Sequence, residues 1–100
     1  MEELIGFDVI SISAPQDRSE FTMRVIDENR NIRNIRFAND DGTKMKVDFS
    51  HVSLNIIYGH DSNATSFGEL EAVNAIENGF EIVGDFGIIW LECTVCFPAI

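Results

Sequence analysis

Basic residues are missing from the second half of this chain. The last one is Lys46, so residues 47–100 carry eight acidic residues and no lysine or arginine, whereas residues 1–46 carry nine acidic and seven basic residues. Most of the formal net charge of -10 therefore lies after residue 46. A phosphate backbone or an anionic membrane would be repelled by such a surface, which argues against binding to nucleic acid or to membranes.

Long apolar runs are also missing. No stretch approaches the roughly 18 uninterrupted apolar residues that a membrane-spanning helix needs. The first ten residues, MEELIGFDVI, are acidic where a secretory signal would be basic, so we expect a cytoplasmic protein with reduced cysteines. One hundred residues suit one core, and we expect a single domain over residues 1–100.

Motifs for catalysis and for metal binding are absent from the sequence. The pair Cys93 and Cys96 has the spacing of half a zinc site. No second pair accompanies it, and His51 and His60 would have to complete the site. If both cysteines lie in one strand, their side chains point to opposite faces and do not meet. We therefore predict two buried thiols, no metal, no cofactor, no catalytic residues and no enzymatic activity.

The first half of the chain reads as strands. We predict a largely buried strand at residues 7–13 and a strand with one more polar face at residues 20–26. Residues 32–37 could form a strand or a short helical piece, and we predict a strand because the stretch is too brief for an independent helix. The Asp-Gly pair in NDDG, residues 39–42, predicts a hairpin turn. An alternating run of residues 43–58 follows it, and the pattern leaves open whether this run is one bent strand or two.

The second half adds one predicted helix, about residues 66–78. Ser66 and Glu69 have the spacing of a capping box. Apolar residues then recur every three positions, and Asn78-Gly79 offers a C-terminal stop; the recurring residues are Phe67, Leu70, Val73 and Ile76.

The chain closes with FEIV, a turn at GDFG and an apolar run, residues 88–97, that we place in the middle of the sheet. These elements predict an α+β fold, a mainly antiparallel β-sheet with the one helix packed on one face.

The chain resembles small acidic bacterial immunity proteins, which neutralise the toxins of neighbouring cells. The resemblance is carried by the length, by the strand-rich stretch NIRNIRFANDDGTKMKVDFSHVSLNIIYG and by the closing GIIWLEC. It covers most of the chain as a pattern and carries over no individual functional residue. It implies an inhibitor that presents carboxylates to a cationic partner, such as a toxin or a basic nuclease.

The acidic second half supplies the candidate partner-binding residues. We select carboxylates on the predicted helix and in the loop before it, with two aromatic anchors: Asp61, Glu69, Glu71, Glu77, Tyr58 and Phe67. Opposite surface potentials would speed association, and the aromatic side chains would slow dissociation.

Two other classes of function stay open at this point. The chain could be a ligand-binding or oligomeric module whose acidity serves only solubility, or a small metal-using enzyme. For each of the selected glutamates, a solvated position without a partner is the simpler interpretation.

Overall fold

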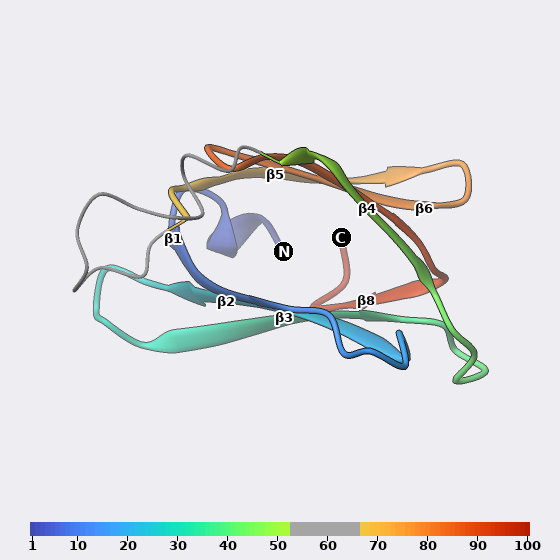
Figure 1. The fold of residues 1–100 in the computed structure, drawn as a ribbon. Coiled ribbons are helices and arrows are strands. Elements are labelled where there is room, and N and C mark those ends of the chain that lie inside the picture. The colour runs from blue at the N-terminus through green and yellow to red at the C-terminus, as the bar shows by residue number, and fades with distance from the viewer. Residues whose placement is uncertain (53–66) are drawn as a thin grey trace.

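Two antiparallel sheets face one another in the computed structural model, which describes residues 1–52 and 67–100 (Figure 1). Sheet A has the strand order β1-β2-β3-β8, and sheet B has the order β4-β7-β6-β5. The elements are η1 (Glu2–Leu4), β1 (Asp8–Ser13), β2 (Glu20–Ile26), β3 (Ile32–Ala38), β4 (Lys46–Val52), β5 (Leu70–Ile76), β6 (Gly79–Gly84), β7 (Gly87–Glu92) and β8 (Val95–Phe97). Within the described ranges, no helix is long and apolar enough to cross a membrane.

The core lies between the sheets and follows the alternation of the strands. In β2 every second side chain is fully buried, namely Phe21, Met23 and Val25. Aromatic rings join the two layers, because the ring of Phe37 in sheet A lies 5.5 Å from that of Phe80 in sheet B. The predicted strands in residues 7–13, 20–26 and 32–37 are thereby confirmed.

Backbone hydrogen bonds close one side of the molecule. Gly6 N–H donates to the Leu70 carbonyl at 2.7 Å, and Leu70 N–H donates to the Phe7 carbonyl at 2.9 Å. Val9 and Phe67 extend this seam, since Phe67 N–H donates to the Val9 carbonyl at 2.8 Å. The start of β1 is thus tied to the approach to β5, and the two sheets form one continuous layer along that side (Figure 1).

The helix predicted over residues 66–78 is wrong, and with it the α+β class. Residues 70–76 form β5, which pairs antiparallel with β6. A bulge lies between Leu70 and Ala72, so that Leu70 and Val73 both face the core although they stand three residues apart. A bulge inserts one residue into a strand and shifts the alternation by one position. The three-residue spacing that suggested a helix is the spacing of a bulged strand.

The hairpin predicted at the NDDG turn is wrong, because the strands on its two sides belong to different sheets. Gly42 has a φ of 76° and its N–H donates to the Asn39 carbonyl at 3.0 Å, so the turn is present. However, β3 before it belongs to sheet A and β4 after it belongs to sheet B. Asp-Gly therefore marks a crossover between the layers. The alternation predicted for residues 43–58 is observed up to Val52, and its remainder lies outside the described residues.

The closing apolar run is divided between the two sheets. β7 is an inner strand of sheet B, as predicted, but it ends at Glu92, and β8 is an edge strand of sheet A. Cys93 lies in the link between them and Cys96 lies in β8, so the expectation of one strand with the cysteines on opposite faces is wrong. Both thiols are buried.

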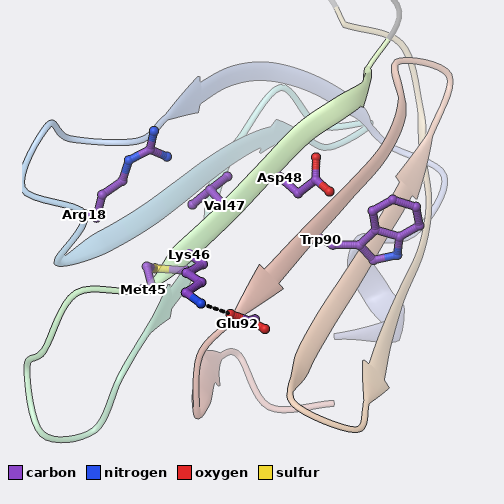
Figure 2. A pocket seen from close by; sticks show the side chains of 7 residues that line it. All are labelled: Arg18, Met45, Lys46, Val47, Asp48, Trp90 and Glu92. Atoms are coloured by element: carbon purple, nitrogen blue, oxygen red, sulfur yellow. Dashed lines mark ion pairs between the residues drawn. The ribbon is translucent and has the colours of Figure 1, made fainter.

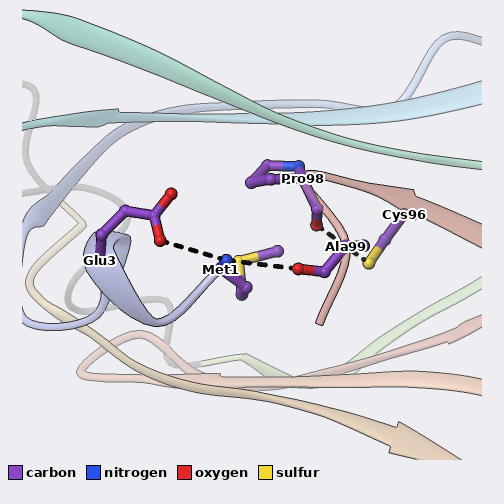
Figure 3. A network of polar contacts seen from close by, with 5 residues as sticks. All are labelled: Met1, Glu3, Cys96, Pro98 and Ala99. Atoms are coloured by element: carbon purple, nitrogen blue, oxygen red, sulfur yellow. Dashed lines mark hydrogen bonds and ion pairs between the residues drawn. The ribbon is translucent and has the colours of Figure 1, made fainter.

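The two ends of the described chain meet between the sheets. The terminal ammonium group of Met1 donates to the Ala99 carbonyl at 3.3 Å and lies 3.5 Å from a carboxylate oxygen of Glu3 (Figure 3). The Cys96 thiol donates to the Pro98 carbonyl at 3.4 Å in the same region. Met1 and Leu4 fill part of the core from this position.

Candidate protein-binding site

The two sheets differ in the charge of their strands. The strands of sheet A contain three arginines and two acidic residues, whereas the strands of sheet B contain four acidic residues and one lysine. The strands of the second half that carry acidic residues thus lie in one layer of the molecule. The outer face of sheet B is the surface on which an acidic binding site has to be sought.

Trp90 stands in the middle of that face. It lies on β7 between neighbours from both adjacent strands, opposite Asp48 of β4 and opposite Glu81 of β6. Asn74 of β5 lies opposite Glu81 and completes a row across all the strands of the sheet. Residues directly opposite one another lie on the same face of a sheet, and Trp90 stands between the buried Ile89 and Leu91, so the row faces outward.

Hydrogen bonds fix the orientation of the Trp90 ring. The indole N–H donates to Oε2 of Glu81 at 3.0 Å, and the side-chain amide of Asn74 donates to Oε1 of the same glutamate at 3.3 Å. The ring of His51 packs edge-on against the indole, with 4.7 Å between the ring centroids. The tryptophan is half-buried and is held from two sides before any partner arrives.

Asp48 is a stable anion beside this ring. Its Oδ1 accepts hydrogen bonds from the Ser50 hydroxyl at 2.6 Å and from the Ser50 backbone N–H at 2.8 Å. These bonds, the hydroxyl first, lower the pKa of the Asp48 carboxyl, and the nearby charge of His51 lowers it further. The bonds span a bulge in β4 between Asp48 and His51. Asp48 is therefore ionised at neutral pH and held in one orientation.

A hollow of about 600 Å³ lies along β4 next to Trp90. Figure 2 shows Asp48, Trp90 and Glu92 on one side of the β4 ribbon and Arg18 on the other. The hollow is lined by Arg18, Met45, Lys46, Val47, Asp48, Trp90 and Glu92. Nζ of Lys46 lies 3.5 Å from Oε2 of Glu92, and both side chains are largely exposed. The hollow is large enough to take a side chain from a partner.

The three predicted glutamates do not form one cluster. Glu69 lies in the seam, where its N–H donates to Oδ2 of Asp85 at 2.9 Å. Glu71 occupies the bulge of β5, and Glu77 lies in the turn between β5 and β6. All three are exposed. Because a strand rises about 3.3 Å per residue, Glu71 and Glu77 are separated by roughly 20 Å, much farther than on a helix.

The predicted aromatic anchors are not part of the Trp90 row. Phe67 is half-buried and packs against the core beside the seam. Tyr58 and Asp61 lie outside the described residues.

Trp90, Glu81 and Asp48 were missed from the sequence, although a signal for two of them was present. The GDFG segment was predicted as a turn, and the structure confirms a hairpin in which Gly84 pairs with Gly87. Counting outward from that pair along an antiparallel hairpin places Glu81 opposite Trp90. Asp48 joins them only through the order of strands in sheet B, which no local pattern shows.

The described part of the chain contains no group of three or more His, Cys, Asp or Glu side chains that could hold a metal ion. Burial, and then the neighbouring Cys96 thiol, raise the pKa of the Cys93 thiol to about 11. A protonated thiol is a poor nucleophile and a poor metal ligand. The cysteines therefore act as core side chains.

Comparison with known proteins gives no relative for this chain. No family model, no curated protein and no solved structure matches it.

Proposed function

We propose that this protein is a protein-binding domain that docks a cationic partner protein on the outer face of sheet B. The single observation that carries the proposal is the Trp90 row, in which a half-buried tryptophan is held between carboxylates on an acidic sheet. Tryptophan is among the residues that most often dominate binding energy at protein interfaces. The carboxylates around it select a partner of positive charge.

The biological role that fits this surface is inhibition of a toxin, as the resemblance to immunity proteins implies. A basic nuclease, for example, keeps a cationic site for its nucleic acid, and an acidic protein that covers this site prevents the substrate from binding. Such an inhibitor acts in the bacterial cytoplasm, where the toxin would otherwise reach its target.

Charge and anchoring contribute differently to this mechanism. The summed charge of the acidic face steers the partner during encounter and sets the association rate. Trp90 acts after contact, because burying its ring removes apolar surface from water and slows dissociation. The mechanism thus needs an acidic surface with an aromatic residue at its centre.

The decisive experiment expresses this protein together with the product of the adjacent reading frame. If that product is toxic when expressed alone, co-expression of the present chain should restore growth, and the two should purify as a complex. Asp48→Lys with Glu92→Lys should slow association by about an order of magnitude at low salt. Glu2→Lys with Glu28→Lys is the matched control, because it changes the net charge equally at exposed sites away from sheet B.

The outcomes separate the parts of the proposal. Equal slowing by both double variants would mean that only net charge matters and that the Trp90 row is not the site. A neighbouring product that is neither bound nor neutralised would remove the inhibitor role.

A second candidate function rests on apolar side chains of sheet A. Ile32 and Phe97 are each 54% exposed on its strands. An oligomeric module would bury them in a contact between copies of the chain. Light scattering at several protein concentrations checks this, and a monomer at every concentration would leave only the first proposal.

A further inference from the structure

We infer that the group which this face recognises on its partner is an arginine side chain, seated in the hollow beside Trp90 with its guanidinium against the indole ring. The inference rests on the proposed function and names the chemistry of the same site. It follows from the indole ring and the two carboxylates in the lining of the hollow; Arg18, which also lines it, lies on the other side of the β4 ribbon (Figure 2).

The polar edge of the Trp90 ring is already used, so a further contact has to be made with its π face. Its one N–H is already donated to Glu81, and the edge-on His51 ring fixes its position further. A π face that is held in place attracts a cation, and a planar guanidinium stacks on it better than a compact ammonium group does. Because the ring is already held in one orientation, little conformational entropy is lost when the arginine side chain binds.

Asp48 supplies the acceptor for such a cation. Both hydrogen bonds from Ser50 reach its Oδ1. Within the described ranges of the chain, no hydrogen bond reaches its Oδ2. The carboxylate stands opposite Trp90 across β4 and β7, so a guanidinium on the ring can donate to it. Charge-assisted bonds of this kind are among the stronger hydrogen bonds in proteins.

Glu92 also lines the hollow and is already paired with a cation. Lys46 lies 3.5 Å from it, but the lysine side chain is 87% exposed, and it makes only a solvated ion pair. Exposed pairs of this kind contribute little to stability. An incoming arginine can therefore take over Glu92 without a large loss. Lys46 lines the hollow with a side chain that is 87% exposed, whereas the indole ring and the two carboxylates match arginine.

The test uses three short peptides with alternating glycine, in which the other residue is arginine, lysine or neutral citrulline. Trp90 is the only tryptophan, so the single indole N–H signal in an NMR spectrum of the labelled full chain reports on this site alone. The arginine peptide should shift that signal and bind more tightly than the lysine peptide, and citrulline should not bind. Trp90→Ala should weaken binding of the arginine peptide by about 2-fold to 30-fold, as expected for a cation–π contact.

Controls keep the outcomes distinct. Trp90→Phe should retain part of the preference for arginine, and Asp48→Asn should weaken binding while the fold, followed by the backbone spectrum, is unchanged. If arginine and lysine peptides bind equally and the indole signal does not move, the arginine inference is wrong and the acidic face remains as proposed. If neither cationic peptide binds more tightly at low salt than citrulline does, the proposed cationic partner is excluded as well.

Discussion

Sheet A and sheet B present similar inner faces to one another and different charges to the solvent. Both contribute fully buried side chains to one core, such as Phe21 from sheet A and Ile89 from sheet B. On their strands, however, sheet A has three basic residues against two acidic ones, and sheet B has one against four. Apolar packing shared by both sheets thus forms the interior, while the proposed function depends on the acidic outer face that only sheet B has.

The largest expected effect on the free energy of unfolding comes from substitutions in the core that the two sheets share. Leu70→Ala in β5 should lower the free energy of unfolding by about 2 to 5 kcal/mol, because the side chain is fully buried. Phe21→Ala in sheet A should cost about 3 to 5 kcal/mol for the same reason. Urea denaturation measures both.

The matched control for Leu70→Ala is Ile76→Ala, at the other end of β5. Ile76 is 43% exposed, so the loss should be less than about 1 kcal/mol. A helix would have buried Leu70 and Ile76 on the same stripe. Equal losses at the two positions would therefore contradict the bulged strand.

A smaller effect is expected where β7 begins beside the end of β4. Gly87 has a φ of 112°, and a Cβ added there would lie 2.2 Å from the His51 carbonyl oxygen of β4. Gly87→Ala should therefore cost about 1 to 3 kcal/mol. Gly42→Ala is the control in the crossover from sheet A, because its φ is also positive but its Cβ would meet nothing within 4 Å. A loss at Gly87 no larger than that at Gly42 would argue against the close approach of β7 to β4.

Acid should weaken both sheets through particular carboxyl groups. Hydrogen bonds from Arg36 and then Thr22 lower the pKa of Glu20 in sheet A below its usual 4.5, and those from Ser50 lower the pKa of Asp48 in sheet B below 3.8. A carboxyl group whose pKa is lower in the folded state stabilises the fold above its usual pKa, and this contribution is lost as the pH falls through the lowered value.

The measurement is the urea midpoint followed from pH 5 down to about pH 2, where these groups titrate. Stability should decline over this interval, and Glu20→Gln and Asp48→Asn should each make the decline shallower. A decline that is identical in both variants and in the wild type would mean that neither carboxyl group gains from its partners in the folded protein.

The smallest expected effect on stability sharpens the difference between the outer faces. Lys46→Ala should change the free energy of unfolding by less than about 0.5 kcal/mol, because its ion pair with Glu92 is exposed. The same change should strengthen binding of the arginine peptide, since it removes the one basic residue on the strands of sheet B. Weaker binding after this substitution would show that Lys46 contacts the ligand itself.

The strands were predicted correctly where apolar and polar residues alternate without interruption. Residues 20–26 alternate along their whole length, and β2 has those same bounds. The prediction failed at β5, because one inserted residue at the bulge brings Leu70 and Val73 to the same face. Ser66 and Glu69 added a helix signal of their own. Local spacing cannot distinguish a bulged strand from a helical turn unless the partner strand is known.

The sequence predicted that the candidate site is acidic, but it did not predict where on the molecule the site lies. The lack of basic residues after Lys46 already indicated an acidic surface. The glutamates chosen for it were assigned to a helix face, and they are spread from the seam to the β5–β6 turn. Trp90 and Glu81 could have been paired from the GDFG turn alone, whereas Asp48 could not.

By itself, the sequence determined the alternation of buried and exposed side chains, the turns and the uneven distribution of charge, since these depend on residues that are close together along the chain. The tertiary structure alone decided that the acidic strands of the second half lie in one sheet, that Asp-Gly leads into a crossover, and that Trp90 stands between Asp48 and Glu81. The physical reason is that side chains on neighbouring strands meet according to strand order and register. Both are set by packing of the whole core, which includes residues far apart in the sequence.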